Sequence, residues 1–526
     1  MPFDSVRTSG DLPNREPKAA ADAGTTGEPF LMIDVRDGRT VVSGAPFCTL
    51  GRETPLQDGK PDGIFARWAW DGSQLQLEND RYGLQPLYYF SDKGRCALSP
   101  SVSKLIELGA PTDLDFEALA VFLHLGYFLG DETPFRAIRA VPPSASCRWS
   151  QGALTIEGRR PRIAAVSLGR DEALAAYVAA FREAIRRRPP ESDDVVLLLS
   201  GGRDSRHILF ELQHDGRPPR TCLTVAYGGE DATVARVVAQ ALGIEHVAVP
   251  GGGMTLAAER RKNELTNFCA DEHAWVLAAA DYLARRPTTL YDGLGGDVLS
   301  AGLFLSPKRL RLYEEGRFLD LARDLSVGSV VVPMFRRDMR EALAEAAPLS
   351  RIAQALESMA GEPNPVSAFC FWNRTRREIA LGPYRMLCAN AVIHSPYVDA
   401  GVYDLLMGMP AASFVDHTFH TDAINLAFPQ HKHLPYAGKT PDGVVSWRQA
   451  GRMVLDLLRS SFAPGNHIVD RGFLVLRLTR ALVDPTYRPS LHWLAQLTIY
   501  LEQLGELQPP TAGAQRVSRS NSSRSN

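Results

Sequence analysis

The sequence lacks the features that mark membrane, secreted and metal-binding proteins. No apolar run among its 526 residues approaches the length that spans a bilayer, and its first residues lack the charged-then-apolar pattern of a signal peptide. It contains no Cys-x-x-Cys pair and no histidines at metal-ligand spacing. Its few cysteines are dispersed, which indicates reduced thiols and a cytoplasmic location. They are Cys48, Cys96, Cys147, Cys222, Cys269, Cys370 and Cys388.

An excess of charge of either sign is also missing. The 58 Lys and Arg residues nearly balance 60 Asp and Glu residues, which leaves a formal net charge of −2. This balance gives no reason to expect nucleic acid or an anionic membrane surface as a partner. A chain of this length should form two or more domains. Residues 1–28 and 506–526 have no apolar periodicity, and we expect both ends to be disordered.

Residues 29–160 are typical of an antiparallel α+β domain. Short strand-like runs cover residues 30–35, 64–70, 75–78 and 87–90. The dipeptides Asp37-Gly38, Asp62-Gly63 and Asp71-Gly72 separate these runs and predict hairpin turns. A stretch with apolar residues at helical spacing, 114–125, follows them.

Residues 161–505 have a different pattern. Predicted helices over 172–187, 205–212 and 231–242 alternate with predicted strands over 195–199 and 221–226. This alternation predicts a doubly wound parallel sheet of the α/β class. Beyond residue 306 the pattern becomes mostly helical, so we expect a helical extension.

The most informative motif lies between the first of these strands and the helix after it. The apolar run 195–199 breaks at Ser200-Gly201-Gly202, and helical spacing resumes after Asp204-Ser205. Glycines allow backbone N–H groups to surround an anion, and a helix N-terminus adds partial positive charge. Ser-Gly-Gly-x-Asp-Ser is typical of loops that bind pyrophosphate in enzymes that cleave ATP to AMP. The alternative is a tight strand-to-helix turn without a ligand.

A second glycine-rich loop, 292–302, follows another strand-like segment. Its carboxylate, Asp297, is the natural ligand for a metal ion because the surrounding glycines allow phosphates to approach closely. The loop alone is weak evidence. It gains weight from its position after the Ser200–Ser205 motif and a βαβ unit.

With these two loops and several further motifs, roughly residues 60–505 resemble the glutamine-hydrolysing asparagine synthetase family. Relatives of that family include β-lactam synthetases and the cyclases that close lasso peptides. In the synthetase half the resemblance also covers 228–246 and Ser395-Pro-Tyr-Val-Asp399. In the N-terminal half it covers 62–66, 80–89, 126–135 and Pro142-Pro143. It implies a glutaminase-like domain of the N-terminal nucleophile type, followed by an ATP-pyrophosphatase domain.

The resemblance implies a role for each matching residue. Asp204 and Asp297 would hold Mg²⁺ on the phosphates of ATP. The pyrophosphate would be bound by Ser200, Gly201, Gly202 and Ser205. The adenosine would be lined by Leu198, Val225 and Gly293, although plain core packing is an alternative for Leu198 and Val225.

The sequence also departs from the family pattern. The family's glutaminase uses a cysteine directly after the initiator methionine, whereas the first cysteine here is the internal Cys48. Leu294 stands where the aminating enzymes carry a glutamate and β-lactam synthetases a tyrosine. His417 falls roughly where a catalytic lysine is expected, although a solvated or helix-packing histidine is the alternative. Weaker sources of that positive charge are His420, Lys439, Arg203 and Arg206.

The sequence therefore predicts an ATP-dependent carbon–nitrogen ligase that forms an acyl-AMP and has lost glutaminase activity. Its substrate would be a small-molecule or peptide carboxylate. A specialised acceptor, such as a peptide that closes as a macrolactam, would imply a precursor peptide and a protease as partners. Two alternatives stay open: a catalytically silent relative that binds nucleotide or a partner, and another adenylating enzyme that shares only the phosphate loop.

Overall fold

A computed structural model describes most of the chain. It covers residues 27–55, 61–150, 152–226, 229–251, 255–326, 332–438, 447–461, 468–487 and 490–508. The predicted disordered ends fall largely outside these residues. At their borders, Glu28 pairs with Arg385 at 2.8 Å, and the Gln508 side chain donates a hydrogen bond to the Thr112 carbonyl oxygen at 2.6 Å. Among the described helices, none is both long and apolar enough to cross a membrane.

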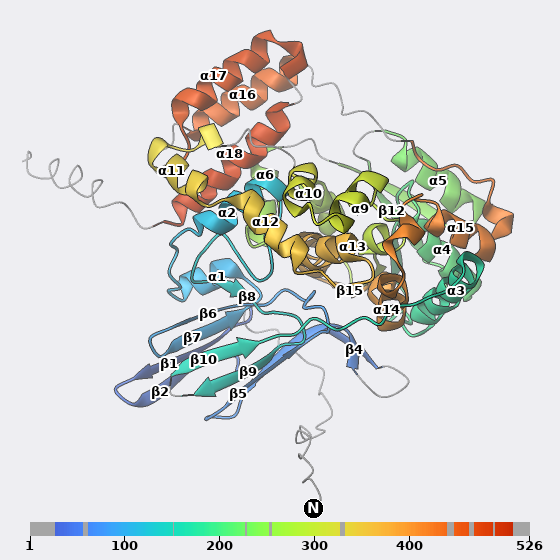
Figure 1. Cartoon of the computed structure of the whole chain (residues 1–526), viewed down its shortest axis with the longest axis horizontal. Coiled ribbons are helices and arrows are strands. Elements are labelled where there is room, and N and C mark those ends of the chain that lie inside the picture. Colours follow the sequence, from blue (N-terminus) through green and yellow to red (C-terminus); the bar gives the residue numbers. More distant parts are fainter. Residues whose placement is uncertain are drawn as a thin grey trace, which may run out of the picture.

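The N-terminal part is built from antiparallel sheets (Figure 1). Five strands pair in the order β2-β1-β7-β6-β8, three in the order β3-β4-β5, and β9 pairs with β10. Their bounds are β1 Leu31–Arg36, β2 Arg39–Gly44, β3 Phe47–Pro55, β4 Pro61–Trp70, β5 Leu75–Asn79, β6 Tyr88–Asp92, β7 Arg95–Ser99, β8 Arg139–Ala140, β9 Ser146–Ser150 and β10 Ala153–Glu157. Apolar side chains of β1, β4, β5 and β7 form one core between the layers, including Ile33, Trp68, Leu77 and Leu98.

One of the three predicted turns is wrong. Asp62-Gly63 lies inside β4, where Asp62 pairs with Thr54 and Gly63 with Glu53 of β3. Gly63 has φ +98°, a conformation that glycine adopts without steric cost. Asp-Gly favours turns because it tolerates positive φ, and here the same tolerance serves an irregular strand. Asp37-Gly38 and Asp71-Gly72 do connect successive strands, as predicted.

The apolar residues on the other face of the five-stranded sheet belong to a second core, which extends through helices from several parts of the chain. These are α1 Val102–Glu107, α2 Phe116–Leu125, α11 Arg337–Glu345, α16 Trp447–Ser461, α17 Arg471–Val483 and α18 Ser490–Glu506. Tyr88 and Phe90 of the sheet share one apolar core with Leu474, Leu478 and other residues of these helices. Figure 1 shows α16, α17 and α18 gathered beside α2 and α6. The last helices of the chain are therefore part of the N-terminal core.

The second sheet is parallel, as predicted, with the strand order β13-β12-β11-β14-β15. Its strands are β11 Val195–Leu198, β12 Thr221–Ala226, β13 Glu245–Pro250, β14 Thr288–Tyr291 and β15 Ala391–His394. Alternate side chains enter different cores: Val195 and Leu197 belong to one and Val196 to the other. Because both faces are covered, nearly every residue of these strands is apolar or buried.

Helices flank this sheet and extend from it. They are α3 Arg170–Arg186, α4 Asp204–His214, α5 Asp231–Ala241, α6 Leu256–Leu265, α7 Leu277–Leu283, α8 Gly296–Leu299, α9 Pro307–Glu314, α10 Phe318–Leu325, α12 Pro348–Glu357, α13 Pro365–Cys370, α14 Ala400–Gly408 and α15 Phe419–Ala427. After α13 the chain continues as a wide π-helix, η3 Phe371–Ile379. Long π-helical segments are rare and often lie at functional sites.

Two motifs that the resemblance identified meet at a buried ion pair between the two parts of the chain. Arg188, directly after α3, donates to Asp399 at 2.6 Å and to Asp62 of β4 at 3.3 Å. All three side chains are at most 4 % exposed. Arg187 also pairs with Asp399. These cations hold the pKa of Asp399 below its usual value, although burial opposes them. Asp62 and Asp399 therefore join the two parts of the chain and have a structural role there.

Candidate active site

The Ser200–Ser205 loop leaves the end of β11 and enters α4 at Asp204, as predicted. Its backbone N–H groups already point at oxygen atoms: Ser200 N donates to the Ser205 hydroxyl at 3.0 Å, and Gly202 N to the Ser200 hydroxyl at 3.1 Å. Gly201 N donates to the Asp231 carboxylate at 3.0 Å. Each of these N–H groups has its own oxygen acceptor, and loops of this kind, at the start of a helix, can bind phosphate oxygens.

The second glycine loop packs directly against the first. A Cβ atom on Gly296 would lie 2.7 Å from Cγ of Asp204, and one on Gly293 would lie 3.2 Å from Cβ of Asp204. Any larger residue at position 296 would displace the Asp204 carboxylate. The glycines therefore let the two loops approach each other, and this approach brings Asp297 beside Asp204.

The pKa values of both carboxylates are raised. Loss of contact with water raises the pKa of Asp204 to about 7. The pKa of Asp297 is also raised, first by desolvation and then by the negative charge of Asp204. Both side chains keep an opening to solvent, with 29 % of Asp204 and 39 % of Asp297 exposed. Two partly desolvated carboxylates that repel each other and face solvent fit the oxygen ligands that Mg²⁺ prefers.

His420 lies beneath Asp204 and positions it. Its Nδ1 is 3.2 Å from the Asp204 carboxylate and 3.0 Å from the Ser300 hydroxyl, and its Nε2 is 3.2 Å from the Tyr397 hydroxyl. Burial lowers the pKa of His420 to about 3, and the charge of Arg203 lowers it further. His420 is therefore neutral at physiological pH, so it does not supply the positive charge considered for it from the sequence.

The other basic candidates have different surroundings. His417 is exposed, with Nδ1 3.1 Å from the Ala301 carbonyl oxygen, and its own carbonyl oxygen accepts from Arg203 at 3.2 Å. Arg206 is buried and donates to the carbonyl oxygens of Leu434 and Pro435. Arg203, which is part of the loop, forms no ion pair with any described residue, so its charge remains available to a phosphate. Lys439 lies outside the described residues.

The apolar candidates lie at the edges of the site. Leu198 and Val225 occupy the ends of β11 and β12 and are half-buried against the core that also contains Val196. Leu294 is 3 % exposed and belongs to the main apolar core. Its side chain therefore contributes packing at the position where the family carries an acid or a tyrosine.

Sequence reasoning missed two charged residues at this site. Asp231, at the start of α5, accepts from Gly201 of the phosphate loop. Arg374, on the π-helix η3, lies 3.6 Å from the Asp297 carboxylate. No sequence pattern pointed to either residue, because each lies on a helix that is distant in sequence from the loop it contacts. Arg374 lies 77 positions after Asp297 in the sequence.

The N-terminal part offers no activated thiol among its described residues. Cys48 lies within β3, and burial raises its pKa to about 11 with no cation contributing. Burial likewise raises the pKa of Cys96 to about 12 and that of Cys147 to about 11. All seven cysteines are free thiols, as their dispersed positions predicted.

Comparison with protein families agrees with this architecture. A family model described as a glutamine amidotransferase domain matches residues 47–159, and one described as asparagine synthase matches residues 176–417. No curated protein matches the chain. The first match covers the antiparallel strands from β3 to β10, and the second covers the parallel sheet with both glycine loops and the Ser395–Asp399 motif. The order of the two domains, their folds and these motifs agree, and the chain belongs to the asparagine synthetase family.

Proposed function

We propose that the protein activates a carboxylate with ATP and joins it to an amine. The observation that carries this proposal is the pairing of Asp204 and Asp297 beside the Ser200–Ser205 loop at the start of α4. The family match supports an ATP-dependent ligase of this general type. The AMP-forming route is the finer part of the proposal, because the Ser-Gly-Gly-x-Asp-Ser loop is typical of enzymes that release pyrophosphate.

The reaction has two steps. An oxygen of the substrate carboxylate attacks the α-phosphorus of ATP, the bond to the β-phosphate oxygen breaks, and pyrophosphate leaves with the electron pair. The amine nitrogen then attacks the acyl carbon, AMP leaves with the electron pair of the carbon–oxygen bond, and the nitrogen loses its proton to solvent. Asp204 and Asp297 would hold Mg²⁺, which neutralises phosphate charge when bound. Arg203 supplies a positive charge at the phosphate loop, and donors aimed at developing charge lower the barrier.

We further propose that the amine does not come from glutamine hydrolysis. Cys48 is an internal residue of β3, so it has no free α-amine to act as its base, and its raised pKa disfavours the thiolate. The buried Leu294 cannot act as a base toward an incoming amine. A specialised acceptor, such as a peptide amine in macrolactam closure, fits both features. A precursor peptide and a protease would then be the partners.

The test is pyrophosphate exchange into ATP with pools of carboxylates and peptides as substrates. Exchange needs no amine, so it reports activation alone. We expect carboxylate-dependent exchange in the wild type and its loss in Asp204→Asn and Asp297→Asn. The exposed Asp113→Asn is the matched control and should keep wild-type exchange. Full exchange in either site variant would show that the metal assignment is wrong.

One observation favours a second candidate function. Asp231 occupies the Gly201 N–H that a phosphate would need, and Ala437 N–H donates to the Gly201 carbonyl oxygen at 3.1 Å. A relative that binds nucleotide or a partner without catalysis could retain such a capped loop. ATP that stabilises the protein against heat, without exchange for any carboxylate pool, would support this function over ligation.

A further inference from the structure

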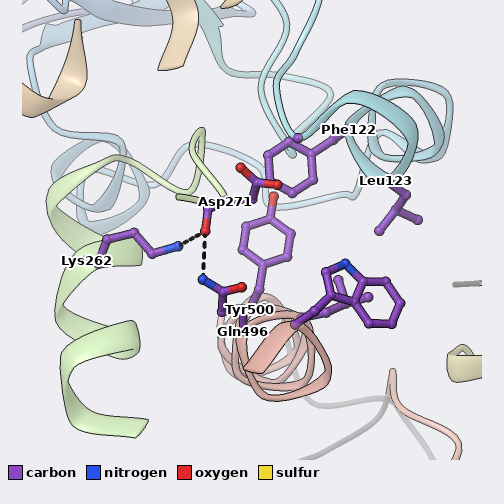
Figure 2. A pocket seen from close by; sticks show the side chains of 9 residues that line it. Phe122, Leu123, Lys262, Asp271, Gln496 and Tyr500 are labelled. Atoms are coloured by element: carbon purple, nitrogen blue, oxygen red, sulfur yellow. Dashed lines mark hydrogen bonds between the residues drawn. The ribbon is translucent and has the colours of Figure 1, made fainter. Parts of the chain in front are cut away.

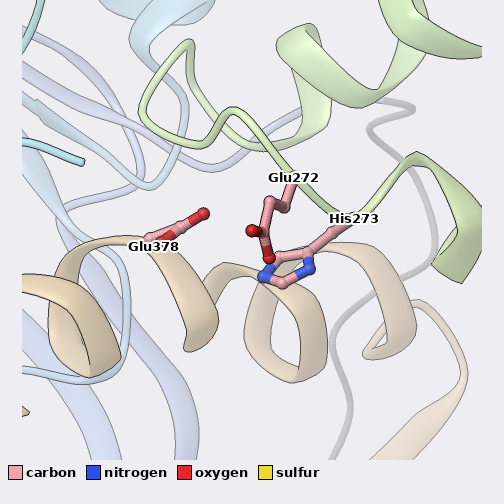
Figure 3. Close-up of side chains that lie close together, drawn as sticks. All are labelled: Glu272, His273 and Glu378. Carbon is pink, nitrogen blue, oxygen red and sulfur yellow. The ribbon is translucent and has the colours of Figure 1, made fainter. Parts of the chain in front are cut away.

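Three side chains outside the phosphate site have polar atoms aimed at one point. Ligand atoms of Glu272, His273 and Glu378 all lie within 4.8 Å of one another (Figure 3). His273 is 9 % exposed and Glu378 is 2 % exposed. Both ring nitrogens of His273 and one carboxylate oxygen of Glu378 have no hydrogen-bond partner among the described residues. Buried polar atoms are nearly always paired, so this arrangement points to a ligand.

The surrounding structure holds the three residues in place. Lys262 of α6 donates to the carbonyl oxygen of Asp271 at 3.0 Å, and Gln496 of α18 approaches the same oxygen at 3.5 Å (Figure 2). These contacts anchor the loop that carries Glu272 and His273. His273 itself has φ +83°, a conformation that is costly for any residue except glycine. Such strain persists only where the surroundings impose it, so the position of the imidazole is strongly determined.

Arg374 places this cluster next to the phosphate site. Its guanidinium lies 3.6 Å from Asp297, 3.7 Å from Glu378 and 3.8 Å from Glu272. One side chain thus separates the cluster from a carboxylate that faces the phosphates. The Glu272 side chain is 60 % exposed, so the cluster opens to solvent. Glu378 and Arg374 both lie on η3, where the widened backbone presents them from successive turns.

The charges and acceptor atoms of the cluster select the class of ligand. Burial and the charge of Asp271 raise the pKa of Glu378. The partnerless Oε1 of Glu378, the Glu272 carboxylate and the His273 imidazole still provide three acceptor atoms, which matches the three N–H bonds of a primary ammonium group. Burial lowers the pKa of His273 to about 3, so its ring is neutral and one nitrogen accepts. The neighbouring Arg374 offsets part of the negative charge that a divalent cation would need to compensate for its loss of hydration. A hydroxyl group could satisfy only one acceptor.

We propose that Glu272, His273 and Glu378 form the binding site for the primary amine of the substrate. The contacts of the cluster alone support a site for an ammonium group. Its role in supplying the nucleophile rests on the proposed function. The amine would be held near the activated carboxylate as an ammonium group. Before it attacks, it must give one proton to the Glu272 carboxylate, and the Arg374 side chain must move aside. This position supplies what Leu294 cannot, namely polar contacts that orient the nitrogen.

Binding is tested with methylammonium chloride as the probe and tetramethylammonium chloride, which has the same charge and no N–H group, as its control. At 100 mM of each salt, roughly tenfold above the dissociation constant expected for a weak site, we expect methylammonium to raise the melting temperature by about 2 °C more than the control. Glu272→Gln, exposed and tolerant of substitution, and Glu378→Gln should each remove this difference. Glu117→Gln, exposed on α2, should retain it. Equal effects of the two salts on the wild type would overturn the proposal.

A metal ion is the competing ligand, and Mn²⁺ distinguishes it. In the Asp204→Asn/Asp297→Asn background, Mn²⁺ should give no stabilisation that depends on His273. A Mn²⁺ effect in that background that His273→Asn abolishes would assign the cluster to a metal and overturn the amine proposal. Because these measurements need neither ATP nor a carboxylate, they can fail or succeed independently of the ligase function.

The nucleophile role is tested by comparing two rates in the same variants. With a carboxylate that supports pyrophosphate exchange and methylamine as nucleophile, Glu272→Gln and Glu378→Gln should lower amide formation at least tenfold more than exchange. The loss should fall mainly on KM for methylamine, which a merely structural defect would not single out. Equal losses in both rates would overturn the role in amine delivery. Absence of exchange in the wild type would instead refute the proposed function.

Discussion

Replacing Arg188 by Met should destabilise the junction between the two parts of the chain more than any surface change nearby. The substitution keeps most of the side-chain volume and removes the guanidinium. Asp399 would still accept from Arg187 and from Gly401 N at 2.9 Å. Asp62 would retain only backbone donors such as Ala400 N at 3.4 Å. A buried carboxylate would therefore lose its only cation among the described residues.

The size of the effect follows from this geometry. Removing one partner of a buried ion pair typically costs about 3–5 kcal/mol, because the remaining charge stays buried. Arg188 is also the main influence that lowers the pKa of Asp62 against the effect of burial. Without it the pKa of Asp62 rises further above its ordinary value. A carboxyl group with a raised pKa stabilises the fold below its unfolded pKa and loses that contribution as the pH rises. The defect should therefore be larger at pH 8 than at pH 5.

Amide hydrogen exchange measures this effect locally, which matters because a chain with two domains need not unfold in one step. The opening free energies of β4 and α14 should fall in Arg188→Met. Arg186→Met is the control, because Arg186 ends α3 two residues before Arg188, is 55 % exposed and pairs only at 3.8 Å. It should cost about 0.5 kcal/mol or less.

A charge-neutral double variant provides the second check. Asp62→Asn combined with Arg188→Met removes the stranded carboxylate and should recover at least about 1 kcal/mol relative to Arg188→Met alone. The reasoning is refuted if Arg188→Met and Arg186→Met differ by less than about 1 kcal/mol, or if the double variant is less stable than the single one.

Three further predictions test other contacts. Gly296→Ala should push the Asp204 carboxylate aside and weaken ATP binding, measured by calorimetry, at least tenfold. Gly451→Ala is the control, because no atom lies within 4 Å of its added Cβ, and it should not weaken binding. Equal affinities of the two variants would contradict the close approach of the loops. Burial lowers the pKa of His394 to about 4, so the unfolded chain takes up a proton first and stability should fall as the pH drops from 6.5 to 4. Urea titrations should show a loss of up to about 3 kcal/mol over this window that His394→Gln reduces, and parallel curves would rule it out. Iodoacetamide should alkylate Cys48 at pH 8 about 100-fold more slowly than free cysteine, because its pKa is about 11; rapid labelling seen by mass spectrometry would show an activated thiol.

Much of the site could be predicted because its interactions are local. Two hydrogen bonds of the Ser200–Ser205 loop join residues at most five positions apart, so short-range chemistry favours the turn, whereas the contact of Gly201 with Asp231 spans 30 positions. Apolar runs that alternate with helical spacing likewise predicted the parallel sheet and the position of β11 and β12, because strands buried on both faces are nearly all apolar. Where local chemistry is ambiguous, the prediction failed. Asp62-Gly63 has the composition of a turn, and only its pairing with β3 and the contact with Arg188 show that it lies in a strand.

The sequence was sufficient for the strand-to-helix turn at Ser200–Ser205, the parallel sheet and the family, because each rests on short-range patterns. Only the tertiary structure placed Arg374 beside Asp297, put neutral His420 beneath Asp204 and gathered Glu272, His273 and Glu378 at one point. It also showed that the last helices complete the N-terminal core. These contacts join residues far apart along the chain. Their energies depend on burial and distance, and no periodic pattern in the amino-acid sequence encodes either of these.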